Sequence, residues 1–225
     1  MLAIRSDITP QIARIVTTRL ADAPRPLRLS YANDVLRMSG SQQRTLRQFC
    51  QVGCELVDAG SIDNNVECVV LAAKGLHALG IPGISFDFSL PSIFQELIAI
   101  NQGDNNNIDA MRAELSGQAQ KSIDKLLALG LSMSAQNDIK QLQEIINRVR
   151  EALNAANTPG IGFTVDPLET KGFEYHKGFA FAVFAKGVNG ELGRGGSYML
   201  GDNQAASGFT FYMDTVRRGC VEQHR

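Results

Sequence analysis

The middle of the chain carries a long helical pattern between two regions of strand pattern. From Pro91 to about Asn157 strand signals are nearly absent, and helices are expected at 92–101, 107–115, 119–129 and 136–156. Strand patterns lie on both sides of this region, so the sheet must take strands from both ends of the chain. The pattern predicts an α+β fold with a core of residues 1–90 and 159–225 and a helical insertion subdomain at 91–158.

Turn and capping residues divide the flanking regions into further elements. Strands are expected at 3–8, 27–38, 47–58, 83–90, 160–165, 178–186 and 206–213. One helix is expected to begin at Thr9-Pro10, because threonine can cap free amides and proline suits the first turn. Another helix is expected from Ser61 to Gly80, and a last one after residue 213. The sequence GRGGS at 193–197 predicts a glycine-rich turn, and the loop SGSQQRT favours an antiparallel pair of strands around it.

The strand expected at 47–58 has one unusual face. Alternation puts Gln48, Cys50, Val52, Cys54 and Leu56 on an ordinary core face. The other face carries Gln51 and Glu55, about 13 Å apart at most at strand rise. Gly53 lies between them and has no side chain to fill the space. This face is interpreted either as a slot for a small polar ligand or as a solvated sheet surface.

Composition limits the classes of partner. Lys and Arg number 22 and Asp and Glu 23, which gives a net charge of −1. The chain thus has no general excess of positive charge that would attract nucleic acid or an anionic membrane. The first residues lack a signal-peptide pattern, and no run approaches the roughly 18 apolar residues of a membrane span. A cytoplasmic protein without nucleic-acid or membrane partners is expected.

The cysteines and histidines do not predict a metal or redox site. The four cysteines, at 50, 54, 68 and 220, lack CxxC spacing and are expected to be buried thiols. The three histidines, at 77, 176 and 224, are too scattered in the sequence to suggest metal ligands. No metal and no cofactor are therefore expected.

Several polar motifs follow one another in a specific order. They are IRSDITPQ, YANDVLRM, RQFCQVGCE, TKGFEYHKG, GRGGSYM and ASGFTFYMDTVRR. In this order they resemble the catalytic core of class II histidyl-tRNA synthetases and of their paralogue, the regulatory subunit of the short-form ATP phosphoribosyltransferase. The resemblance covers nearly the whole chain and is weakest in the helical region. It implies an antiparallel class II synthetase-like sheet flanked by helices.

The same resemblance implies a pocket for free histidine. Its residues would be Asp7, Thr9, Gln51, Glu55, Lys171, Tyr175 and His176. A carboxylate suits the ammonium of an amino acid, and polar side chains can bond its imidazole. Other interpretations remain open: Asp7 and Thr9 can cap the following helix, and Lys171, Glu174 and Tyr175 can be surface residues at the start of a strand.

The residues at the positions that bind ATP in the synthetases are altered in this sequence. Arg37 matches a synthetase arginine and is the candidate anion contact, but Ser39 stands where the synthetases have its glutamate partner. Thr45 and Thr215 occupy the positions of two further arginines, and Thr215 would face the nucleotide phosphates. A hydroxyl cannot replace the charge of a planar cation. The resemblance therefore implies a protein without activation chemistry.

The function implied is that of a non-catalytic regulatory subunit. Its partner would be the short catalytic ATP phosphoribosyltransferase, with free histidine as effector in the first step of histidine biosynthesis. The anticodon-binding domain of the synthetases and the dimer segment ahead of the first strand have no counterpart in these 225 residues. The alternatives are a truncated histidyl-tRNA synthetase-like enzyme that activates histidine or modifies another substrate, and a separate histidine-binding module with another partner.

Overall fold

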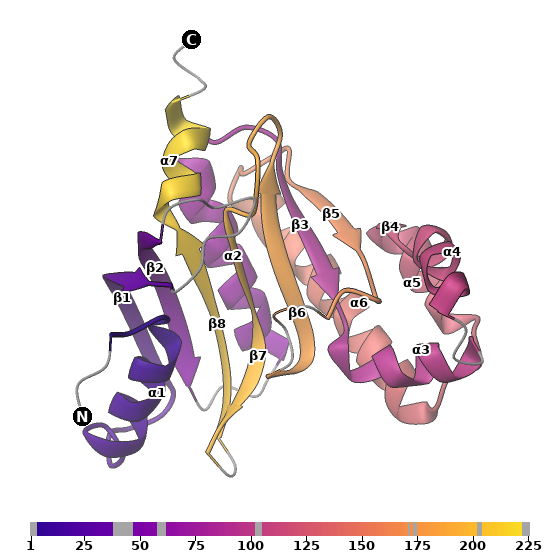
Figure 1. Ribbon diagram of the computed structural model, residues 1–225, viewed down its shortest axis with the longest axis horizontal. Helices are drawn as coiled ribbons and strands as arrows, with labels where there is room; N and C mark the ends of the chain where they lie inside the picture. The colour runs from indigo at the N-terminus through magenta and orange to yellow at the C-terminus, as the bar shows by residue number, and fades with distance from the viewer. Residues whose placement is uncertain are drawn as a thin grey trace.

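A mixed sheet forms the centre of the computed structural model, which describes residues 4–37, 47–57, 62–101, 105–170, 172, 175–201 and 204–221. Within these residues the strand order is β1-β2-β8-β7-β6-β3-β5-β4 (Figure 1). The strands are β1 (Leu27–Leu36), β2 (Gln48–Val57), β3 (Ile84–Ser89), β4 (Gly117–Gln118), β5 (Gly162–Val165), β6 (His176–Ala185), β7 (Gly193–Leu200) and β8 (Gln204–Tyr212). The predicted α+β fold, with strands from both ends of the chain, is confirmed.

The sheet is antiparallel except for one pair of neighbours. β1 and β2 pair antiparallel, as expected from the loop between them, and place Tyr31 opposite Gly53. β3 and β5 run parallel, and the other described pairs of neighbouring strands are antiparallel, so the antiparallel character expected of the sheet is confirmed for most of it. A parallel pair needs a long crossover connection, and the helical region between β3 and β5 supplies it.

The structure has the expected helices, both in the helical region and outside it, and their ends differ from the expected bounds by a few residues. The described helices are α1 (Thr9–Thr18), α2 (Ile62–Ala78), α3 (Phe94–Ile100), α4 (Asn105–Leu115), α5 (Ala119–Leu127), α6 (Met133–Ala155) and α7 (Met213–Val221), with a 3-10 turn at Pro91–Ile93. The short strand β4 pairs antiparallel with β5 and was not predicted. The division into a core and an inserted subdomain at 91–158 stays a prediction.

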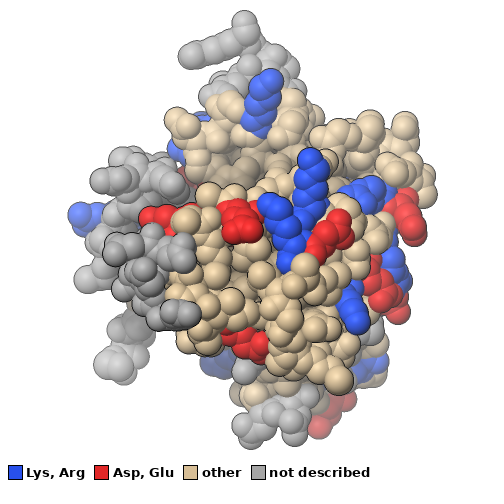
Figure 2. All heavy atoms as spheres, turned by 90° about the vertical axis from the view of Figure 1, so that its right-hand side faces the viewer, with Lys and Arg blue, Asp and Glu red and all other residues tan. Residues whose placement is uncertain are grey.

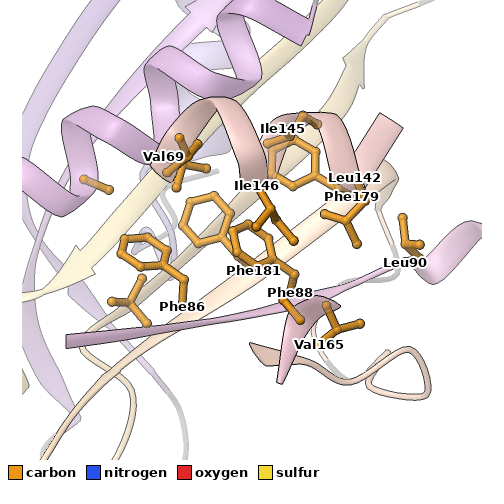
Figure 3. Close-up of a cluster of buried hydrophobic side chains, with 14 of the residues drawn as sticks. Val69, Phe86, Phe88, Leu90, Leu142, Ile145, Ile146, Val165, Phe179 and Phe181 are labelled. Carbon is orange, nitrogen blue, oxygen red and sulfur yellow. The ribbon is translucent and has the colours of Figure 1, made fainter. Parts of the chain in front are cut away.

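The main core lies between the sheet and the helices α2 and α6. Phe86, Phe88 and Phe181 point from the sheet toward Val69 of α2 and Ile146 of α6 (Figure 3). The three phenylalanine rings lie 5.5 to 6.3 Å apart between centroids. Burial of these large side chains from distant segments joins the helical region to the sheet in one apolar cluster.

Three local expectations are wrong. Residues 4–8 form no strand, although the Leu36 amide donates a 3.0 Å hydrogen bond to the Arg5 carbonyl. GRGGS is not a turn but the start of the central strand β7. Gly195 leaves room there for Phe181, whose Cζ would lie 2.6 Å from an added Cβ. The four cysteines are free thiols, but only Cys68 is buried and the others are half-buried.

Charged side chains do not gather by sign on the face at the β4 end of the sheet. Figure 2 shows basic and acidic residues interspersed there. Among the described residues, no group of three or more His, Cys, Asp or Glu side chains could hold a metal ion. In the same residues, no helix is long and apolar enough to cross a bilayer.

Candidate functional site

A cavity of about 260 Å³ lies on the sheet face that carries α1. It brings together the described residues of the predicted histidine pocket, which are Asp7, Thr9, Gln51, Glu55, Tyr175 and His176. Arg37 lines the same cavity. Lys171, Glu174, Ser39 and Thr45 lie outside the described residues, so their predicted roles stay predictions. Residues from Asp7 to Tyr212, almost the whole length of the described chain, thus surround one volume.

Glu55 is the deepest acidic group of the cavity, with 1% of the residue exposed. The Tyr198 hydroxyl donates to Oε2 at 2.7 Å, and the Thr9 hydroxyl donates to Oε1 at 3.0 Å. Burial raises the pKa of Glu55 to about 7, while these two hydrogen bonds act in the opposite direction. The described contacts of Glu55 include no cation, so an ammonium or imidazolium group would be a favourable partner for its carboxylate.

The position of Glu55 depends on a glycine in the neighbouring strand. Gly208 of β8 pairs with Glu55 across the sheet. An added Cβ at Gly208 would overlap Oε2 of Glu55. The absence of a side chain at this point is what lets the carboxylate lie flat against β8.

Gln51 joins the segment before α1 to the sheet. Its Oε1 accepts a 3.0 Å hydrogen bond from the Ile8 amide, and Oδ1 of Asp7 accepts from the same amide at 2.8 Å. The N-cap of α1 is Ile8, without a side-chain cap, and Thr9 is already helical. The capping role predicted for Thr9 is therefore wrong, and its hydroxyl faces Glu55 instead.

The expected open slot above Gly53 is filled by a tyrosine. The Tyr31 hydroxyl lies 2.6 Å from Thr210 Oγ1 and 3.4 Å from Thr9 Oγ1, and it would overlap a Cβ at Gly53. The face with Gln51 and Glu55 is fully buried in β2, whereas Cys50, Val52 and Cys54 are half-buried. The solvated-face interpretation is thus wrong, and the core face predicted for the other side is confirmed at Leu56, which is buried, and at Cys54, which packs against the main core.

Aromatic rings form one wall of the cavity. The rings of Tyr175 and His176 lie 4.1 Å apart between centroids, and Tyr175 meets Tyr198 edge-on at 6.1 Å. His176 is buried, whereas Tyr175 is 53% exposed. Tyr175 is therefore at the mouth of the cavity, half in solvent and half against the other two rings.

Tyr31, Arg194 and Tyr198 are site residues that the sequence interpretation missed. Arg194 forms an ion pair with Glu191 at 2.6 Å and donates to the Gly172 carbonyl at 3.2 Å, which ties β7 to the segment before Tyr175. Reading GRGGSYM as a strand would have placed Arg194 and Tyr198 on one face, four residues apart. The place of Tyr31 in the site follows from the register of β1 and β2, which puts Tyr31 opposite Gly53.

Two arginines, Arg37 and Arg194, are the cationic residues among the described lining of the cavity. Arg37 lies over the ring of Phe49, 5.3 Å from its centroid. Thr215 of α7 is fully buried and accepts a 3.1 Å hydrogen bond from Arg218. Thr215 is not among the residues that line the cavity. The residue at the position where the resemblance would put the phosphate-binding arginine is therefore an uncharged threonine, and its hydroxyl is paired with Arg218.

Comparison with known proteins identifies the family. The histidyl-tRNA synthetase family model matches residues 1–158 and 128–216. The ATP phosphoribosyltransferase regulatory subunits of Paramagnetospirillum magneticum and Rhodospirillum centenum are 37% and 38% identical over 96% and 97% of this chain. The chain spans 62% of the length of each of these relatives.

Solved structures share the fold. A regulatory subunit/histidyl-tRNA synthetase from Bacillus halodurans superposes with a TM-score of 0.77 at 20% identity, over 96% of this chain and 64% of that one. A chain of the ATP phosphoribosyl transferase complex from Thermotoga maritima gives 0.63 at 15% identity, over 94% and 81%. With its sheet, its motif order and the family match in agreement, the chain belongs to the histidyl-tRNA synthetase family.

Proposed function

We propose that this chain acts as a non-catalytic regulatory subunit of an ATP phosphoribosyltransferase. Its partner is the short-form catalytic subunit, and its role is to support activity and histidine feedback in the first step of histidine biosynthesis. The similarity to regulatory subunits of two bacteria supports this proposal. The proposal includes a cytoplasmic location, and it involves no cofactor, nucleic acid or membrane.

The observation that carries the proposal is an asymmetry within the site. The amino-acid side has a buried carboxylate, Glu55, held by two hydroxyl donors and faced by aromatic rings. By the resemblance, Thr215 stands where an arginine would be needed against the phosphates of a nucleotide, and Thr215 does not line the cavity. A preorganised charge of this kind commonly contributes about 3 kcal/mol to such a reaction. Binding of histidine without its activation fits this combination.

Free histidine is the proposed ligand of the cavity. Glu55 would accept from a cationic group of the ligand, with Thr9 orienting the carboxylate and Gln51 and Asp7 holding the segment before α1. Tyr175 and His176 would contact the ring of the ligand. Lys171 and Arg37 are proposed to lie near its carboxylate or another anion.

Two measurements test the function. In size-exclusion chromatography with a short-form transferase, the two proteins should elute as one complex, and the transferase rate should exceed that of the catalytic chain alone. Separate elution with an unchanged rate would contradict the proposal. Histidine-dependent ATP–pyrophosphate exchange by this chain, lost in Lys171→Ala, would instead establish the second candidate, a truncated synthetase-like enzyme.

A further inference from the structure

A second cavity, of about 170 Å³, lies on the opposite face of the sheet. Helices α2 and α6 contribute Asn65, Asp138 and Gln141, and strands β7 and β8 contribute Ser197 and Ser207. Tyr198 lines both cavities. The second cavity thus adjoins β7 from the helical side and is separate from the site around Glu55.

One side of the second cavity is apolar. Leu142 and Ile145 of α6 line it together with Phe179 of β6. These three side chains lie near one another at the edge of the main core (Figure 3). The main core therefore continues directly into the wall of the cavity, which offers a surface for an apolar group.

Hydrogen bonds position two polar residues that line the cavity, Ser207 and Asp138. The buried Ser207 hydroxyl donates to Oδ1 of Asn65. The Ser92 hydroxyl donates to Oδ2 of Asp138 at 2.7 Å. Oδ1 of Asp138 accepts no hydrogen bond from a described residue. The carboxylate is thus fixed through one oxygen, and the other remains able to accept from a ligand.

Charge selects the class of ligand. Asp138 is the sole charged side chain among the described lining residues. A carboxylate or phosphate would meet like charge there, whereas an ammonium would gain a charged acceptor. We propose that this cavity binds a small organic amine with an apolar body, its ammonium at Asp138 and its body against Leu142 and Phe179. This inference does not depend on the proposed regulatory function.

Benzylamine, benzyl alcohol and benzoate form a matched set of probes, because they share one ring and differ in charge. Each is titrated into the isotope-labelled chain and followed by amide chemical shifts. Benzylamine should bind most tightly and benzoate least, with shifts at Gln141 and Ser197. Asp138→Asn should weaken benzylamine binding by roughly three- to tenfold and leave benzyl alcohol unchanged.

Two further variants make the test specific. Asp124→Asn removes a carboxylate from α5, away from the cavity, and should change none of the affinities. Ala205→Phe puts a ring into the cavity and should abolish binding of all three probes. Benzylamine shifts confined to residues around Glu55, equal affinities for benzylamine and benzoate, an unchanged affinity in Asp138→Asn, or no binding of any probe would each overturn the proposal.

Discussion

At the scale of single residues, Glu55 is the group on which ligand binding should depend most. It is buried, it accepts from Tyr198 and Thr9, and its described contacts include no cation. Glu55→Gln keeps the shape of the side chain and removes its charge. Histidine affinity, measured by calorimetric titration, should fall by about 1.5–3 kcal/mol, or roughly ten- to a hundredfold.

The matched control for this change is Glu151→Gln, the same substitution at an exposed position of α6. It should leave histidine affinity as in the parent chain. Equal affinities for histidine in the parent and in Glu55→Gln would show that histidine does not bind at this carboxylate.

Glu55 should also make stability depend on pH. Its pKa is about 7 in the folded chain, raised by burial from 4.5, so the folded state holds a proton that the unfolded state releases between these values. The stabilising contribution is fully present below about pH 4.5 and is lost as pH rises through 7. Between pH 5 and 8 the free energy of unfolding of the parent should therefore fall relative to Glu55→Gln, by about 1–3 kcal/mol.

Urea unfolding at a series of pH values measures this difference. Subtracting the Glu55→Gln curve removes the contribution of all other titrating groups, provided that they behave alike in both proteins. The free energy of unfolding of the parent minus that of Glu55→Gln should fall as pH rises. A value that stays constant from pH 5 to 8, or that increases with pH, would contradict the raised pKa.

At the scale of elements, the close contact of β2 and β8 requires a glycine at position 208. Gly208→Ala should push a methyl group into the Glu55 carboxylate, since an added Cβ overlaps Oε2. Overpacking of this kind commonly costs about 1–3 kcal/mol, so the melting temperature and the histidine affinity should both fall.

Gly75→Ala is the matched control for Gly208→Ala. Gly75 lies inside α2, and an added Cβ would be 3.7 Å from Phe211, an ordinary contact. Alanine is a better helix former than glycine, so this change should stabilise the chain by about 0.5–1 kcal/mol. Destabilisation of equal size in both variants would show that the contact with Glu55 is not the cause.

At the scale of the whole molecule, the helical region and the sheet share one apolar cluster. Ile146 of α6 is 2% exposed and packs in the cluster of Phe86 and Phe181. Ile146→Ala should lower the free energy of unfolding by about 2–4 kcal/mol. Thermal unfolding should remain a single transition by circular dichroism and by calorimetry, because sheet and helices lose the same core.

The exposed side chain of Met133, at the start of the same helix, serves as the control. It is 87% exposed, and Met133→Ala should change stability by less than about 0.5 kcal/mol. Two separate transitions in the parent chain, with only one of them shifted by Ile146→Ala, would mean that residues 91–158 fold as an independent unit.

Local patterns in the sequence determined the helices and most strands, and the resemblance of its motifs to a known family supplied part of the site. Apolar periodicity placed α2 and α6, and the motif order brought Asp7, Thr9, Gln51 and Glu55 into one predicted pocket, which the structure assembles. These features depend on neighbouring residues or on motifs that can be recognised from the order of residues in the sequence. They are therefore visible without the fold.

Only the tertiary structure decided what covers each face of the sheet. GRGGS has the composition of a turn, but it forms β7 because β6 and β8 pair with it on both sides. Gly53 suggested an open slot, but Tyr31 of the paired strand fills it. The raised pKa of Glu55 is caused by burial among residues from several segments of the chain. Burial and cross-strand packing depend on segments far apart in the sequence. A local pattern cannot specify them.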